Sequence, residues 1–110
     1  MIVLSVMLKA KPGNEKALEE AVMDMMGKVC SENGTIDYAF HRHQTRPGLF
    51  FLYEKYKDKN AFDGHMATDY LKQLLKHFDE TLEEQPRVER FEQIASIQSM
   101  SASERIQDSG

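Results

Sequence analysis

GLFFLYEKYKDKNAFDGHMA, residues 48–67, is the stretch that decides the fold. It opens with an apolar run, passes through a polar turn and ends in a short helical pattern. Because the side chains of a strand alternate between its faces, residues 49–56 place apolar groups on both faces. This pattern predicts a strand covered on both sides, in the middle of a sheet. One face carries Phe50, Leu52, Glu54 and Tyr56, and the other carries Leu49, Phe51, Tyr53 and Lys55.

The same stretch sets two ionisable groups into apolar surroundings. Glu54 interrupts the strand, while Phe62, His65 and Met66 fall three and four residues apart in the helical pattern and so form one stripe. Imidazole groups exchange protons near neutral pH, and a buried carboxylate needs a partner. We therefore expect any chemistry of this protein to lie near Glu54 and His65.

The other segments follow a regular order. We expect strands over residues 1–9, 35–45 and 87–97, and a first helix from Glu15 to Glu32. Asn33-Gly34 predicts a left-handed stop after that helix, and the second helix is expected to break near Thr68-Asp69. The order βαββαβ is that of the ferredoxin-like split unit, an α+β fold with a four-stranded antiparallel sheet.

The two helical segments of such a unit cover only one face of the sheet. Strands 1–9 and 49–56 are apolar on both faces and take the central positions, so a large apolar surface is left open. Patches of that size usually mark an interface. We expect a second copy of the chain to cover this one, giving a two-fold homodimer with sheet facing sheet. A single domain is expected over residues 1–98, with a disordered polar tail at 99–110.

Composition excludes several classes of partner. The 110 residues carry 14 Lys and Arg against 18 Asp and Glu, a net charge of −4, and no basic stripe, so nucleic-acid binding is not expected. The apolar residues 2–8 lack a basic start and a cleavage site and are too short to span a bilayer, so no membrane partner is expected. Cys30 is the single cysteine; we expect a buried inert thiol in a cytoplasmic protein.

Several residues together resemble a known family. The likeness rests on Glu32, Gly34, Tyr38, Phe51, Tyr53, Glu54, Tyr56, Ala61, Phe62 and His65. Over most of residues 1–97 the chain resembles the antibiotic biosynthesis monooxygenase family, whose quinol-monooxygenase-like members are dimeric α+β barrels of this size. Many members oxidise phenolic or quinol substrates with O₂ and need no cofactor. One branch instead processes the phosphorylated autoinducer-2 signal, and another degrades haem.

The chain departs from the family pattern in two places. Members often carry Trp at the position of Tyr56, and His-Phe where Asp69-Tyr70 stands, so any role of that histidine is lost here. The haem-degrading branch also uses a haem-ligating His, and Leu75 stands nearest to it. Haem degradation is therefore disfavoured, although His77 is close in sequence.

The resemblance implies His65 as a catalytic base and Glu54 as a catalytic group that orients His65 or binds substrate. On the residues alone, His65 is at least as well explained as a half-buried helix histidine, and Glu54 as an ion-pair partner of Arg42 or Arg90. A flat aromatic ring would lie against apolar walls, with its oxygen held by a tyrosine. The expected substrate-binding residues are Tyr38, Phe51 (or Phe50 on the other face), Tyr56, Phe62, Met66 and Leu74.

The main hypothesis is a cofactor-independent monooxygenase that oxidises an aromatic quinol or phenol with O₂. A deprotonated phenol is electron-rich enough to pass an electron to O₂ directly. Two alternatives stay open: an isomerase of a small phosphorylated signal, using cations such as Arg42, Arg46 or Lys55, and a non-catalytic ligand-binding dimer. His41 and His43 share a strand face, but no third ligand is close in sequence, so no metal is expected.

Overall fold

A computed structural model describes residues 1–100 of the chain. Its elements are β1 (Ile2–Lys9), α1 (Glu15–Val29), β2 (Thr35–Arg42), β3 (Leu49–Tyr56), α2 (Lys59–Met66), α3 (Asp69–Thr81), β4 (Arg87–Glu92) and η1, a 3₁₀ helix (Ile97–Ser99). This order confirms the predicted βαββαβ arrangement, with the second helical segment divided into α2 and α3.

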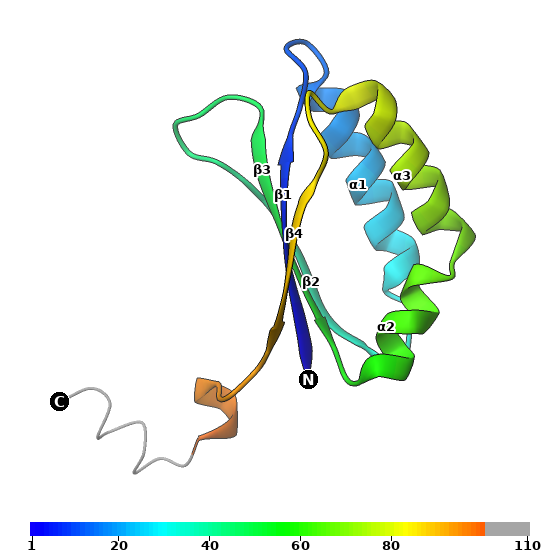
Figure 1. The fold of residues 1–110 in the computed structure, drawn as a ribbon, viewed down its shortest axis with the longest axis vertical. Coiled ribbons are helices and arrows are strands. Elements are labelled where there is room, and N and C mark those ends of the chain that lie inside the picture. The colour runs from blue at the N-terminus through cyan, green and yellow to red at the C-terminus, as the bar shows by residue number, and fades with distance from the viewer. Residues whose placement is uncertain (101–110) are drawn as a thin grey trace, which may run out of the picture.

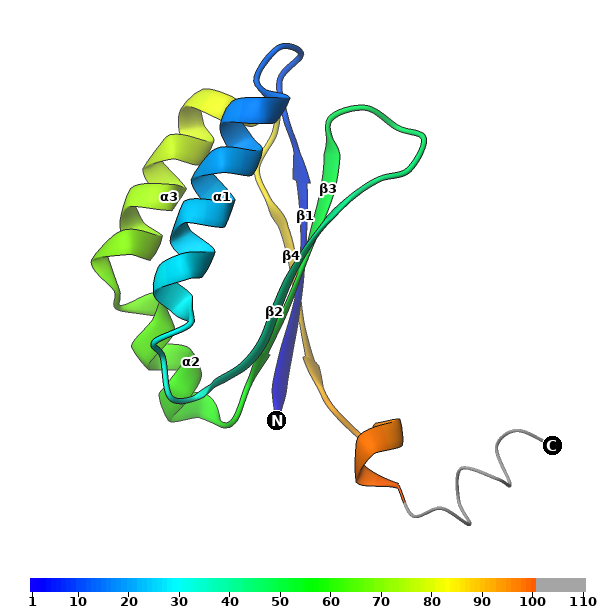
Figure 2. The same cartoon turned by 180° about the vertical axis from the view of Figure 1, so that it is seen from behind.

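The four strands form one antiparallel sheet in the order β2-β3-β1-β4. β1 and β3 therefore hold the central positions, as the apolar character of both their faces predicts. The helices α1, α2 and α3 lie together on one side of the sheet, which is seen edge-on in Figure 1 and in the opposite view of Figure 2. The predicted α+β class is confirmed.

The core fills the space between the sheet and the helices. On β3, the face that carries Phe50, Leu52, Glu54 and Tyr56 is buried against the helices, whereas the alternate residues are only partly covered. Burial of these apolar groups is the main source of stability for such a layered fold. The same core contains Leu4, Val6 and Leu8 from β1, Leu18, Val22, Met25 and Val29 from α1, and Leu71, Leu74 and Phe78 from α3.

The break between α2 and α3 follows from a capping residue, as predicted. The hydroxyl of Thr68 accepts a hydrogen bond from the backbone N–H of Leu71 at 3.4 Å and gives α3 an N-cap of its own. Asp58 caps α2 in the same way. Because the chain restarts at the break, His65 in the last turn of α2 and Tyr70 in the first turn of α3 both reach the turn that follows α1.

Three predictions around the end of α1 are wrong. The helix ends at Val29 rather than at Glu32, and Cys30, the residue that caps it, is exposed rather than buried. Gly34 has no positive φ and is not a left-handed stop. A close approach explains the glycine instead, because a Cβ added at position 34 would lie 2.2 Å from the Cβ of Ala61.

Two strands are shorter than predicted. β2 ends at Arg42 rather than near Thr45, and β4 ends at Glu92, while Ile97 belongs to η1. The pairing partner of Glu92 is Ile2, at the beginning of β1, so little backbone remains to continue the ladder. Apart from its first two residues, the predicted disordered tail at 99–110 lies outside the described residues.

Gly34→Ala is expected to destabilise the protein by roughly 1–3 kcal/mol, because the added methyl group overlaps Ala61. The carbonyl of Gly34 also accepts a hydrogen bond from the N–H of Lys57 at 2.8 Å, which holds the backbone in place. Gly27→Ala is the matched control, because a Cβ there meets nothing within 4 Å. This substitution should raise the free energy of unfolding by about 0.5–1 kcal/mol. Urea unfolding of both variants checks this, and equal stabilities would contradict it.

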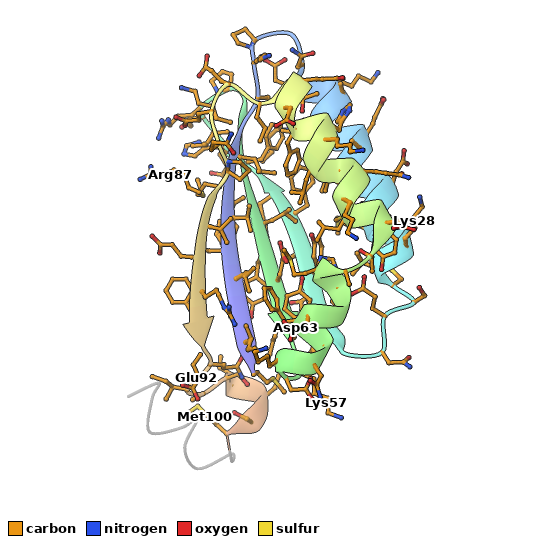
Figure 3. The ribbon with its side chains drawn as sticks, turned by 45° about the vertical axis from the view of Figure 1, so that its right-hand side comes forward. Lys28, Lys57, Asp63, Arg87, Glu92 and Met100 are labelled. Carbon is orange, nitrogen blue, oxygen red and sulfur yellow. The ribbon has the colours of Figure 1, made fainter. Side chains whose placement is uncertain are left out.

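The second side of the sheet carries no α-helix among residues 1–100, and the short η1 lies toward it beyond the end of β4 (Figure 1). In Figure 3, Arg87 and Glu92 mark the two ends of β4, and Lys28 and Asp63 lie on the helical side. An open cavity of about 480 Å³ lies on the uncovered face, and its lining includes Met7, Leu49, Phe51 and Tyr53. This uncovered, largely apolar surface is what we call the open face.

Candidate active site

Five ionisable side chains meet on the buried face of the sheet. Glu54 and Tyr56 come from β3, Tyr38 from β2, His65 from α2, and Glu32 from the turn after α1. The register places Tyr38 directly opposite Glu54. His65 is 2% exposed and Glu54 is 6% exposed, so both groups lie inside the protein. The fold thus brings four of the residues named from the sequence into one cluster and adds Glu32 to them.

The imidazole of His65 is bound by a carboxylate through one nitrogen. Its Nδ1 lies 3.0 Å from each carboxylate oxygen of Glu32. The rings of Tyr56 and Tyr38 pack around it, with centroids at 5.3 Å and 5.6 Å. In residues 1–100, no group forms a hydrogen bond with the other ring nitrogen, Nε2. His65 is therefore anchored at Nδ1 and forms no hydrogen bond at Nε2 within the described residues.

Glu32 accepts hydrogen bonds from three side chains. Besides His65, these are the hydroxyl of Thr35, at 2.7 Å, and the hydroxyl of Tyr70. Burial alone would raise the pKa of Glu32, but the hydrogen bonds from Tyr70, Thr35 and His65 outweigh burial and hold the pKa below its usual value. Burial and the bond to Glu32 raise the pKa of Tyr70 to about 12. At neutral pH Glu32 is therefore ionised and Tyr70 is a donor.

Glu54 lies in a different environment. Burial raises its pKa, against the hydrogen bonds from Tyr56 and Tyr38 and the charge of His65. The hydroxyl of Tyr56 donates to Oε1 of Glu54 at 2.5 Å. Burial and the nearby carboxylate also raise the pKa values of Tyr38 and Tyr56, so both phenols stay protonated at neutral pH. The pKa values of the two carboxyl groups, Glu32 and Glu54, are thus shifted in opposite directions.

Neither arginine considered as an ion-pair partner of Glu54 takes that role. Arg42 forms an ion pair with Glu19 of α1. The guanidinium of Arg90 lies 4.6 Å from the centroid of the Phe62 ring, in a cation–π contact. Glu54 is therefore held by phenols rather than by an arginine.

The family is shown by sequence. A family model described as antibiotic biosynthesis monooxygenase matches residues 1–77, which include β1 to most of α3. The chain belongs to the antibiotic biosynthesis monooxygenase family. No curated protein matches the chain.

Solved structures of this family and of similar proteins have the same fold. A Caulobacter crescentus protein described as a candidate antibiotic biosynthesis monooxygenase is 26% identical, with a TM-score of 0.81 over 86% of this chain and 90% of that one. A Shewanella oneidensis protein is 28% identical, with a TM-score of 0.79 over 84% and 89% of the two chains. A Nitrosomonas europaea protein at 20% identity and a TM-score of 0.82, over 86% of this chain and 100% of that one, shows the fold alone.

The remaining residues expected to bind substrate take three different positions in this member of the family. Phe62 packs edge-on against Tyr56 at 5.5 Å, and Leu74 is buried in the same core. Met66 is 44% exposed at the end of α2. Phe51 belongs to the open face, so the sheet separates it from the imidazole of His65. Of the two phenylalanines considered for that role, Phe50 is the one on the side of the cluster.

Two further kinds of site are not found within residues 1–100. No group of three His, Cys, Asp or Glu side chains could hold a metal ion. His41 Nδ1 is bonded to the carbonyl of Phe51 at 3.1 Å, and His43 Nδ1 accepts from the backbone N–H groups of Thr45 and Arg46. None of the helices is both long and apolar enough to cross a membrane.

Sequence patterns do not assign Glu32, Thr35 or Tyr70 to the site. Glu32 lies 33 residues before His65, and neither helical nor strand periodicity relates the two. The one available signal is that Glu32 and Gly34 belong to the pattern shared with the family. The close packing of Gly34 against Ala61 indicates that the turn carrying Glu32 is pressed against α2.

Proposed function

We propose that this protein is a cofactor-independent monooxygenase that acts on an aromatic quinol or phenol with O₂. The observation that carries the proposal is His65. It is a buried imidazole between two tyrosine rings, with Nδ1 on an ionised carboxylate and Nε2 unbonded within the described chain. Family membership supports the general class of activity.

The chemistry balances without an external reductant. Nε2 of His65 takes the phenolic proton of the substrate, and the electron-rich anion then reacts with O₂. One oxygen atom enters the ring and the other leaves as water, so that a phenol and O₂ give a quinone and water. The substrate itself supplies the electrons. The rings of Tyr38 and Tyr56 pack beside the imidazole, and Phe62 supplies an apolar wall.

Oxygen uptake tests this function directly. The purified full chain is incubated with a panel of hydroquinones, naphthohydroquinones and phenols, and both O₂ consumption and quinone absorbance are recorded. We expect one substrate class to give enzyme-dependent uptake with one quinone formed per O₂. Saturable ligand binding without uptake across the panel would instead indicate a non-catalytic binding protein.

The isomerase alternative has less support from the described residues. A phosphorylated substrate needs a cation beside the base. Arg42 is already paired with Glu19, and Lys55 alternates with Glu54 and so lies on the other face of β3 from the cluster. Uptake of O₂ by the wild-type protein would separate the two functions.

We propose further that two copies pair through the open face in the cytoplasm, where an exposed thiol such as that of Cys30 stays reduced. Light scattering at micromolar concentration should give about twice the 12.7 kDa of one chain. Phe51→Asp places a charge on the open face and is expected to give monomers. Met23→Asp, on the exposed surface of α1, is the matched control and should stay dimeric. A monomeric wild-type protein would contradict this pairing.

A further inference from the structure

One carboxylate joins four separate parts of the chain. Glu32 lies in the turn after α1, and its donors are Thr35 at the start of β2, His65 at the end of α2 and Tyr70 at the start of α3. Oε1 accepts from Thr35 and from His65, while Oε2 accepts from Tyr70 and from His65. The carboxylate is therefore fixed on both oxygens before it meets the imidazole.

This geometry determines which nitrogen of His65 carries a proton. An ionised carboxylate only accepts hydrogen bonds, so the Nδ1 that lies 3.0 Å from both oxygens of Glu32 must be the donor. In the neutral imidazole this leaves Nε2 without a proton and able to accept one. The opposite tautomer would set a lone pair of Nδ1 against the negative charge of Glu32.

We propose that Glu32, held by Thr35 and Tyr70, is the positioning residue that keeps His65 in the Nδ1–H form. Thr35 and Tyr70 keep the carboxylate ionised and oriented, since without them burial would favour its neutral form. The break at Thr68 is what allows Tyr70 and His65, five residues apart, to reach the same carboxylate.

The other groups around His65 do not perform this function. Tyr38 and Tyr56 contact the imidazole through their rings. Glu54 accepts a hydrogen bond from the hydroxyl of Tyr56 and makes no hydrogen bond to His65. Glu32 is therefore the one carboxylate in the described chain that bonds the imidazole. The inference rests on the proposed function only in taking His65 as the base.

Nitrogen-15 NMR of the imidazole groups tests the proposal on the full chain without any substrate. The chain has four histidines, and the spectrum of His65→Gln identifies the signals of His65. Wild-type His65 in its neutral form is expected to be Nδ1–H. Glu32→Gln should populate the Nε2–H form, because an amide can donate to Nδ1. Thr35→Val and Tyr70→Phe should shift the tautomer in the same direction, by less.

Glu19→Gln removes a partly buried carboxylate on α1 that pairs with Arg42 and takes no part in the cluster; it is the matched control and should leave the His65 signals unchanged. Nε2–H in the wild type, or an unchanged spectrum in a folded Glu32→Gln variant, would overturn the proposal. Once a quinol that the wild-type protein oxidises is identified, Glu32→Gln should also lower kcat for it on the order of 10²-fold or more with KM little changed. If no quinol is oxidised, the proposed function fails, whereas the NMR result still decides the role of Glu32.

Discussion

His65→Gln is expected to lower quinol turnover on the order of 10²- to 10⁴-fold, the usual cost of removing a general base. Glutamine keeps a polar side chain of similar reach that can still bond Glu32, but it cannot take a proton from the substrate. The fold should therefore survive while the chemistry is lost. Oxygen uptake and the melting temperature, measured on the same sample, separate the two effects.

His77→Gln is the matched control for this experiment. His77 is a helical histidine on α3 that takes no part in the cluster, so turnover should stay within a few-fold of wild type even if the melting temperature changes. A His65→Gln variant that keeps near-normal turnover in a destabilised protein would assign His65 to packing. The proposed active site would then have no base.

Much of this fold is predictable because the physical signals are local. The apolar residues on both faces of β1 and β3 identify the central strands, and Thr68 marks the helix break. Gly34 is a position where the local sequence signal gives a wrong prediction. A glycine after a helix suggests a left-handed turn, but this one is present because Ala61 lies 2.2 Å from where a Cβ would be, a contact between residues far apart in sequence.

The site is only partly predictable for the same reason. Glu54 and His65 lie close in sequence and stand out as polar groups in apolar stretches. The carboxylate that bonds His65 is Glu32, which reaches it from the turn after α1. Alternation along a strand identifies Phe51 and Glu54 as belonging to opposite faces, but only the position of the helices shows that Phe51 is on the open one.

The two carboxyl groups of the cluster are expected to affect stability in opposite directions at neutral pH. Glu32 has a lowered pKa in the folded protein, so its carboxylate stabilises the fold at pH values above 4.5, its pKa in the unfolded chain. This contribution is lost as the pH falls through the pKa of the folded protein. Burial raises the pKa of Glu54. Its contribution is complete below the unfolded value of 4.5 and is lost as the pH rises through the folded pKa.

Glu32→Gln is therefore expected to lower the free energy of unfolding by about 1.5–3 kcal/mol at pH 7, the typical worth of a hydrogen bond to a charged group. Glu54→Gln should instead leave stability unchanged or raise it at pH 7, because an amide can accept the hydroxyl of Tyr56 without the cost of a buried charge. Urea unfolding between pH 4 and pH 8, with equal m-values, measures both.

The pH dependence separates this prediction from a simple loss of packing. As the pH falls, the wild-type protein loses the contribution of ionised Glu32, so the deficit of Glu32→Gln should shrink, whereas a packing defect would persist at every pH. Glu20→Gln, on the exposed face of α1, is the control and should follow the wild type throughout. A Glu54→Gln variant that loses as much stability as Glu32→Gln at pH 7 would mean that the hydrogen bonds from Tyr38 and Tyr56 outweigh the cost of burying the Glu54 carboxylate. The different environments assigned to Glu32 and Glu54 would then be wrong.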